Sequence, residues 1–278
     1  MTLVVGWIGL DDKKDKTGKA IKSIASVYFA SDSRYSWNNG KSYFDYGQKL
    51  WRCRRFPEMF CYCGDVIFPT TALGKLTDEI DSGILFEPDC NAEEKFRIVG
   101  QWLTAIFNAY PKGALTDNVN RIYYATKSKK EISICQYEYK EGKTLSLAIK
   151  EIDEEHTFFS DGSGNVDFKH YLDSENQASK NNANTSRAVF HAFCMTLKGS
   201  NVSTVGGVPQ LMGMFRGIDT VQIFGYIDEN KNLFVNGCSV EGIVSDENLS
   251  RIQWHNCNFE NMNPHTRVIL TGAQRQPF

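Results

Sequence analysis

Three residues near the start of the chain could together make a nucleophile: Thr2, Asp32 and Lys49. Met1 is usually removed when the next side chain is small, and its removal would leave the Thr2 hydroxyl beside its own α-amine. That amine has an ordinary pKa of roughly 8, so it can act as a base at neutral pH. A nearby Lys49 ammonium would keep the amine neutral, and the Asp32 carboxylate would hold the lysine in place. This arrangement predicts attack by Thr2 on a carbonyl carbon.

The tetrahedral oxyanion formed by such an attack needs a hydrogen-bond donor. Gly64 follows a strand pattern and precedes a helix pattern, so its backbone N–H at a sharp turn is a candidate donor. Simpler interpretations also exist: Thr2 is an ordinary second residue, and Asp32 and Lys49 form a surface ion pair. The order and spacing of the residues favour the catalytic interpretation.

The apolar pattern places these residues at the ends of strands. Residues 2–9 and 21–30 are rich in β-branched and apolar side chains, so we expect a hairpin across a charged turn at 11–18. Short strands are expected at 43–46 and 56–63, and an antiparallel meander at 121–126, 131–139, 144–149 and 157–159. Further strands are expected near 210–215, 220–226 and 232–235.

Helices are expected in two pairs. The first helix begins at Asp65, and the second has a capping-box-like start at residues 91–94 and ends before residue 111. The third lies within 167–184, and the fourth begins at Thr185 or Ser186. Strands and helix pairs without βαβ units predict an α+β fold, a four-layer αββα sandwich of two antiparallel sheets flanked by helices. We expect one domain over residues 1–278, with residues 248–278 as a C-terminal extension of uncertain role.

Composition excludes several classes of function. Lys and Arg number 31 and Asp and Glu number 33, so no basic surplus would attract nucleic acid. The longest apolar run, near residues 4–10, is too short to span a bilayer. It also lacks the charged segment that precedes the apolar run of a secretory signal. We therefore expect no membrane association and a cytoplasmic location.

The cysteines and histidines indicate neither a disulfide framework nor a metal site. Eight cysteines are scattered through a long chain and are expected to be reduced thiols. Cys61 and Cys63 could join Cys53 as zinc ligands, but their spacing is not that of typical zinc pairs. The five histidines form no metal-type pair. The expected chemistry needs no metal and no organic cofactor.

Five short stretches, in order, resemble the proteasome β-subunit and HslV-type peptidases of the bacterial proteasome-related type, which are N-terminal nucleophile (Ntn) hydrolases. The stretches are residues 2–6 (TLVVG), 29–34 (FASDSR), 49–50 (KL), 63–65 (CGD) and 162–164 (GSG). The resemblance covers roughly residues 2–235 and is strongest before residue 65. It implies that Thr2 is the nucleophile, that Asp32 and Lys49 tune it, that the Gly64 amide is the oxyanion donor and that Ser163 lies near the terminal amine.

The resemblance also implies supporting roles and shows one departure. Arg34 would be structural, Tyr62 would line the specificity pocket and Gly47 would contact the substrate. The family usually carries an Asp-x-x-Ser-Gly-Gly stretch after the fourth helix, but residues 202–207 here read VSTVGG. Val202 and Val205 therefore replace the acid and the serine. Either Ser203 or Thr204 substitutes for them imperfectly, or the site is weaker than in a typical protease of this family.

Together these inferences predict a threonine-type peptidase or amidohydrolase that cleaves a peptide or polypeptide through an acyl-enzyme. The resemblance further implies a homo-oligomer, as a ring or spiral, and an ATP-dependent unfoldase as a partner. Two alternatives stay open. One is an amidase that acts on a small amide, and the other is a noncatalytic assembly subunit, which the missing acid at residue 202 or a retained Met1 would favour.

Overall fold

The computed structural model describes residues 2–14, 20–87, 89–111, 115, 120–140, 146–150, 158–178 and 183–272. The strands of the first half are β1 (Leu3–Lys14), β2 (Ala20–Ser31), β3 (Tyr35–Trp37), β4 (Ser42–Phe44), β5 (Leu50–Arg52), β6 (Glu58–Cys63), β7 (Asn120–Ser128) and β8 (Glu131–Tyr139). Those of the second half are β9 (Ser146–Lys150), β10 (Phe158–Gly162), β11 (Gln210–Phe215), β12 (Gln222–Ile227), β13 (Leu233–Val235), β14 (Cys238–Ser239), β15 (Gln253–His255) and β16 (Asn261–Met262). The helices are α1 (Ile67–Asp81), α2 (Ala92–Ala109), α3 (Asn165–Ala178), α4 (Ser186–Gly199) and α5 (Asp246–Leu249).

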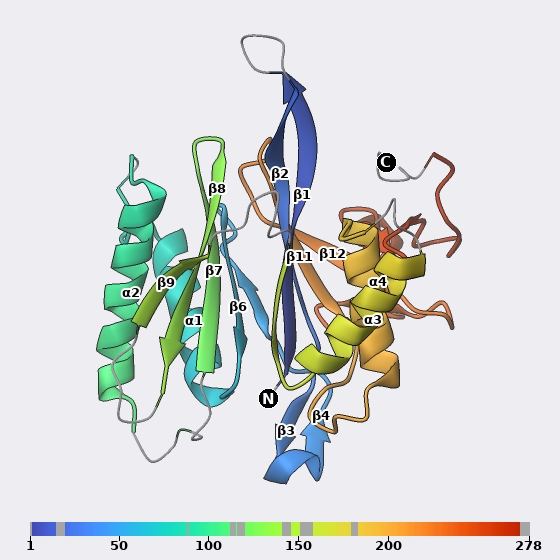
Figure 1. Cartoon of the computed structure of the whole chain (residues 1–278), viewed down its shortest axis with the longest axis horizontal. Helices are drawn as coiled ribbons and strands as arrows, with labels where there is room; N and C mark the ends of the chain where they lie inside the picture. The colour runs from blue at the N-terminus through green and yellow to red at the C-terminus, as the bar shows by residue number, and fades with distance from the viewer. Residues whose placement is uncertain are drawn as a thin grey trace.

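Most strands belong to two sheets. The large sheet has nine strands, ordered β10-β1-β2-β11-β12-β13-β14, with β15 also paired to β12 and β16 paired to β15. The small sheet has five strands in the order β5-β6-β7-β8-β9. In Figure 1, α1 and α2 lie beside the small sheet, α3 and α4 lie beside the large sheet, and β1 and β2 extend beyond the other strands.

Alternation along the strands produces three main apolar clusters, because successive side chains point to opposite faces of a sheet. On β1, Leu3, Val5 and Trp7 pack with residues of α3 and α4, whereas Val4 and Ile8 pack between the two sheets. On the small sheet, one face packs on α1 and α2. Strands buried on both faces read as continuous apolar runs, which is why the sequence revealed them.

The helix starts follow local capping chemistry. Asn91 accepts a hydrogen bond from the Glu94 N–H and the Glu94 side chain accepts one from Asn91 N–H, so the predicted capping box of α2 is confirmed. Thr185 caps α4 by accepting from the Ala188 N–H at 3.3 Å, as predicted. None of the helices in the described ranges is long and apolar enough to cross a membrane.

The predicted four-layer sandwich of two antiparallel sheets is wrong. The described residues form three sheets, mostly antiparallel, with five helices. The third sheet consists of β3 and β4, which pair only with each other. The large sheet is not purely antiparallel either, since β15 runs parallel to β12. Residues 253–262 carry no clear strand pattern, and their pairing partner is a distant strand, so the sequence did not reveal this addition.

Two local predictions also change. The expected meander is broken at its last strand, because β10 leaves the small sheet and pairs with β1 at the edge of the large sheet. The expected turn at 11–18 is shorter than predicted, since residues 11–14 continue β1, while residues 15–18 lie outside the described ranges. The single-domain assignment stays a prediction. The described part of the C-terminal extension packs Leu249, Trp254 and Met262 against residues of β12 and β13, and residues 273–278 are not described.

Candidate active site

The β1–β2 hairpin brings Thr2 and Asp32 together. Thr2 directly precedes β1, Asp32 directly follows β2, and the antiparallel register pairs Val4 with Ser31. The Leu3 N–H donates to Asp32 Oδ1 at 3.0 Å, and the Thr2 hydroxyl donates to the same oxygen. Local hairpin geometry therefore builds the first half of the site.

Lys49 completes this group from the small sheet, where it directly precedes β5. Its Nζ donates to Asp32 Oδ1 at 2.7 Å and to Thr2 Oγ1. Thr2, Asp32 and Lys49 are at most 1% exposed. Burial lowers the pKa of Lys49 below its ordinary value of 10.5, and the Asp32 carboxylate opposes that shift. The site thus places a buried lysine, whose pKa is lowered, against the Thr2 hydroxyl.

Several backbone and side-chain groups fix Asp32. Its Oδ2 accepts from the Arg34 N–H at 3.3 Å and from the Gly206 N–H at 3.2 Å. Gln210 bridges the two sheets, since its Nε2 donates to the Asp32 carbonyl at 3.2 Å and its Oε1 accepts from the Lys49 N–H at 3.1 Å. The Asp32 side chain is therefore held in one orientation by donors from four segments of the chain, at residues 2–3, 34, 49 and 206.

Arg34 has the structural surroundings that its predicted role requires. Its guanidinium makes a two-point contact with Asp45, with Nε to Oδ1 at 2.7 Å and NH2 to Oδ2 at 2.8 Å. The pKa of Arg34 is raised, chiefly by this contact. Its NH1 also donates to the Ser203 carbonyl at 3.1 Å. Arg34 thereby ties the segment after β2 to the segment after α4.

The turn after β10 encloses the Thr2 carbonyl. The Ser163 hydroxyl and the Gly164 N–H each donate to the Thr2 oxygen at 3.4 Å. Gly162 has a φ of +96°, and a Cβ there would lie 2.1 Å from the same oxygen, so only glycine fits. Ser163 therefore contacts Thr2, and the Thr2 group that it contacts is the backbone carbonyl oxygen.

Thr204 contacts Ser163. The hydroxyls of Thr204 and Ser163 lie 2.8 Å apart. Val205 is 4% exposed and Val202 is partly buried, and both pack in the apolar cluster between the large sheet and its helices. The two positions at which the resembled family carries an acid and a serine therefore serve packing here, and the neutral hydroxyl of Thr204 lies between them in the sequence.

Gly64 occupies the predicted sharp turn between β6 and α1. Its φ is +103°, and a Cβ there would lie 2.2 Å from Asn120 Oδ1. The following residue, Asp65, donates its N–H to that Asn120 oxygen at 2.5 Å and accepts from the Phe68 N–H at the start of α1. The role of the Gly64 amide as oxyanion donor stays a prediction.

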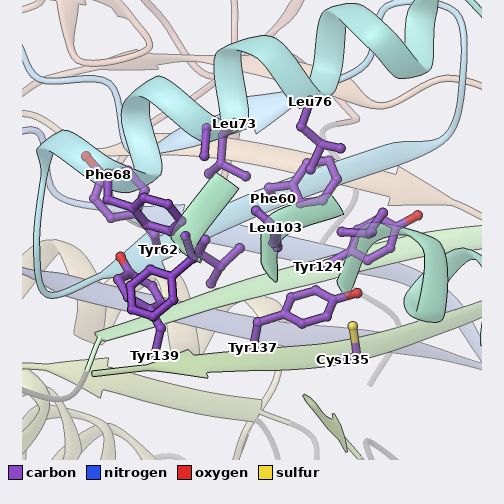
Figure 2. Close-up of a cluster of buried hydrophobic side chains, with 14 of the residues drawn as sticks. Phe60, Tyr62, Phe68, Leu73, Leu76, Leu103, Tyr124, Cys135, Tyr137 and Tyr139 are labelled. Carbon is purple, nitrogen blue, oxygen red and sulfur yellow. The ribbon is translucent and has the colours of Figure 1, made fainter. Parts of the chain in front are cut away.

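The two predicted substrate contacts are buried. Tyr62 is 1% exposed and packs in the cluster between the small sheet and α1 and α2 (Figure 2). Its hydroxyl lies 3.3 Å from that of Tyr35, and Gly47 lies so close to the Tyr35 ring that a Cβ would be 2.3 Å from it. Cavities of about 440 and 150 Å³ lie beside α2 and α4, and neither Tyr62 nor Gly47 lines them. Substrate contact by these two residues stays a prediction.

Comparison with known proteins gives a fold but no family. No family model matches the chain, and no curated protein matches it. Among solved structures, the chain is similar to an Anbu (Gly-1) mutant from Hyphomicrobium sp. strain MC1, with a TM-score of 0.51 and 16% identity over 80% of this chain and 86% of that one. It is also similar to Anbu (ancestral beta-subunit) from Yersinia bercovieri, with a TM-score of 0.50 and 14% identity over 79% of this chain and 82% of that one. The chain shares the fold of these Anbu proteins.

The predicted resemblance to proteasome β-subunits and HslV-type peptidases is corrected by this finding. The similar structures are Anbu proteins, at identities low enough that the likeness concerns the fold alone. The stretches behind the prediction are two to six residues long. Motifs so short indicate where turns and strand ends lie, but they are not enough to assign a family.

Sequence reasoning missed three of the residues that build the site: Gly206, Gln210 and Asp45. The glycines at 206–207 end the stretch that was compared with the family, but that stretch gives no sign of the contact between the Gly206 N–H and Asp32. Gln210 opens a strand and is 1% exposed, so a polar residue at the start of an apolar run was the available signal. Asp45 carried no signal, because its partner Arg34 lies across a loop.

Proposed function

We propose that the chain is a threonine-type amide hydrolase in which Thr2, exposed by removal of Met1, attacks a carbonyl carbon. The observation that carries this proposal is the joint contact of the Thr2 hydroxyl with Lys49 Nζ and Asp32 Oδ1 in a buried site. A nucleophile in hydrogen-bond contact with a base, which is oriented by a third group, is the arrangement that covalent catalysis requires.

In the proposed reaction, the Thr2 oxygen forms a bond to the carbonyl carbon as its proton passes to a base. Lys49 in its neutral form is one such base, because it is within hydrogen-bonding reach and its pKa is lowered by burial. The freed α-amine of Thr2 is the other. The base then protonates the leaving amine, and water releases the acyl group from Thr2. Apart from this water, the groups that act on the substrate belong to the chain itself.

The proposed substrate is a peptide or polypeptide, and a homo-oligomer with an ATP-dependent unfoldase partner is part of the same proposal. One similar structure is described as a beta-subunit, which supports an assembling chain. A small amide is the alternative substrate on the same site. Parallel assays on fluorogenic peptides and on small acyl-amides distinguish the two.

A noncatalytic assembly subunit is the second candidate function, and one observation favours it. Val202 and Val205 are packed into the apolar cluster, so the group near Ser163 is the neutral hydroxyl of Thr204, whereas the resembled family carries an acid in this stretch. Without that acid, the terminal amine would have one fewer negative group near it.

The test compares Thr2→Val with Thr2→Ser in the full chain, after intact mass measurement shows whether Met1 has been removed. Valine keeps the branched shape but lacks the hydroxyl, whereas serine keeps the nucleophile. We expect Thr2→Val to lose at least about 10³-fold in rate and Thr2→Ser to retain activity. Equal activity of the parent and the Val variant, or a retained Met1 with no cleavage, would rule out the catalytic proposal in favour of the assembly subunit.

A further inference from the structure

A carboxylate on β10, that of Asp161, reaches from the large sheet to the small one. Asp161 lies opposite Val4 in the register of β1 and β10, and Val4 packs between the two sheets. Side chains directly opposite each other in an antiparallel pair point to the same face. Thr2, two residues before Val4, is on this face too, and its hydroxyl meets Lys49 there. Asp161 therefore faces the same space between the sheets as the candidate active site.

Three side chains of the small sheet donate to one oxygen of this carboxylate. Asp161 Oδ2 accepts from Cys63 Sγ at the end of β6 at 3.1 Å. On β7, Arg121 NH1 and the Tyr123 hydroxyl donate to the same oxygen, each at 2.7 Å. The other oxygen, Oδ1, accepts from the Gly162 N–H at 2.7 Å. One oxygen thus binds the small sheet, and the other binds the turn that follows β10.

The protonation states of the carboxyl group and the thiol fit these contacts. Burial raises the pKa of the Cys63 thiol and the Asp161 charge raises it further, so the thiol keeps its proton and can donate. Burial also opposes the ionisation of Asp161, but the hydrogen bonds that it accepts outweigh burial and lower its pKa below the ordinary value. At neutral pH a charged acceptor therefore faces a neutral thiol donor.

Asp161 lies between the two turns that the proposed reaction needs. On one side, its own strand leads into the turn that encloses the Thr2 carbonyl. On the other side, its donor Cys63 directly precedes Gly64, whose amide is the proposed oxyanion donor. One carboxylate therefore connects the segment that holds the nucleophile to the segment that carries the oxyanion donor.

We propose that Asp161 is a positioning residue that, through Cys63, holds the Gly64 amide at the distance from Thr2 that oxyanion binding requires. This inference rests on the proposed hydrolase function, because the oxyanion forms only in that reaction. Gly64 follows a strand of the small sheet and Thr2 precedes one of the large sheet, so their separation depends on contacts between the sheets. A displacement of about 1 Å in such a site can lower a rate by about 10²-fold.

Glu138 on β8 provides a matched control, because it forms the other ion pair of Arg121. Its Oε2 lies 3.0 Å from Arg121 Nε, on the side chain that also binds Asp161. Glu138→Gln therefore removes an ion pair of the same arginine and leaves the link from Asp161 through Cys63 in place.

The test measures kcat and KM of the full chain on a fluorogenic peptide and on a small acyl-amide, and the affinity for a peptide aldehyde that forms a tetrahedral adduct with Thr2. We expect Asp161→Asn and Cys63→Ala each to lower kcat by about 10–10²-fold with KM nearly unchanged, because the oxyanion donor acts in the transition state. Affinity for the aldehyde should fall by a similar factor, since the adduct resembles the transition state. Glu138→Gln should keep the parent values.

Two further comparisons separate positioning from a merely structural role. Cys63→Ser keeps a hydrogen-bond donor toward Asp161, so it should recover most of the kcat that Cys63→Ala loses. Asp161→Asn and Cys63→Ala break the same link, so the double variant should lose little more than the larger single loss. A loss of stability alone would change the folded fraction, which urea unfolding measures, and would leave kcat per folded molecule unchanged.

The possible failures are distinguishable. The inference alone is overturned if Thr2→Val abolishes hydrolysis while Asp161→Asn keeps kcat within about twofold of the parent, or while Cys63→Ser is no better than Cys63→Ala. If the parent hydrolyses neither substrate, or if Thr2→Val hydrolyses as fast as the parent, the proposed function fails and this inference fails with it.

Discussion

Two buried lysine–carboxylate pairs, Lys49–Asp32 and Lys95–Glu58, have the same contact distance and different surroundings. In each pair the lysine Nζ lies 2.7 Å from a carboxylate oxygen, and both carboxylates are fully buried. Lys49 spans from the small sheet to the large one, whereas Lys95 on α2 reaches down onto the helix-covered face of the small sheet. The pairs are therefore a natural comparison of one interaction in two settings.

The partners of the two lysines differ. Lys95 Nζ also donates to Thr126 Oγ1 at 3.2 Å and to the Lys127 carbonyl at 3.3 Å, so three acceptors surround its three protons. Lys49 Nζ donates to Asp32 and to the Thr2 hydroxyl, a group that can itself react. Each carboxylate has one further side-chain donor, which is the Thr2 hydroxyl for Asp32 and the Tyr124 hydroxyl for Glu58. Burial raises the pKa of Glu58.

The difference in acceptors indicates a different role for each buried ion pair. A lysine surrounded by unreactive acceptors fixes a helix on a sheet, and its removal leaves a buried charge without compensation. A lysine whose remaining contact is a hydroxyl at the start of a strand can exchange a proton with that hydroxyl. The number and type of acceptors around the ammonium separate the two pairs, while the ion-pair distance does not.

The largest expected effect on stability comes from Lys95→Met. This change leaves Glu58 buried with Tyr124 as its main donor, so the free energy of unfolding should fall by about 3–5 kcal/mol. Urea unfolding measures it, and hydrolysis per folded molecule should stay unchanged. The added Glu58→Gln change should recover a large part of the loss, and a purely additive double-mutant cycle would contradict the pairing.

Lys49→Met should instead affect hydrolysis more than stability. On the proposed function, we expect hydrolysis to fall by about 10²–10⁴-fold, because the variant loses the proposed proton-transfer group. Its free energy of unfolding should fall less than that of Lys95→Met, because Asp32 keeps donors from Thr2, Leu3 and Gly206. Steady-state assays of the two lysine variants, with urea unfolding of each, measure both quantities. Equal losses of activity in the two variants would remove the distinction between the pairs.

The pH dependence of stability should show the lowered pKa of Lys49. Between this lowered value and 10.5, the unfolded chain binds more protons than the folded one, so the free energy of unfolding rises with pH. The slope from this group is at most about 1.4 kcal/mol per pH unit, and it ends above 10.5. Urea unfolding at several alkaline pH values should show a shallower rise in Lys49→Met. Identical slopes would mean that Lys49 holds its proton normally.

The smallest effect is expected at Thr204. Thr204→Val removes a buried hydroxyl and its contact with Ser163, which should cost about 1 kcal/mol of stability. Hydrolysis should fall by less than tenfold, because Ser163 keeps its contact with the Thr2 carbonyl. Thermal unfolding and rate assays should show a smaller change for Ser203→Ala. A larger effect at Ser203 would identify it as the residue that replaces the missing acid.

Local patterns predicted much of the secondary structure. The capping box at residues 91–94 fixed the start of α2, and alternation along β6 placed Cys61 and Cys63 on one face, away from Cys53 in the other cluster. The pairing of strands was less predictable. β10 lies next to the small-sheet strands in sequence but pairs with β1, because a free sheet edge there satisfies its backbone groups.

The sequence by itself determined that Thr2 and Asp32 meet, because they flank two strands that a hairpin must bring into register. It also placed glycines where turns need a positive φ, as at Gly64 and Gly162. Only the tertiary structure decided that Lys49 reaches them from the other sheet, and that Thr204 faces Ser163 while Val202 and Val205 pack inward. Hairpin pairing depends on neighbours in sequence, whereas these contacts depend on how two sheets and a loop pack, which no short pattern records.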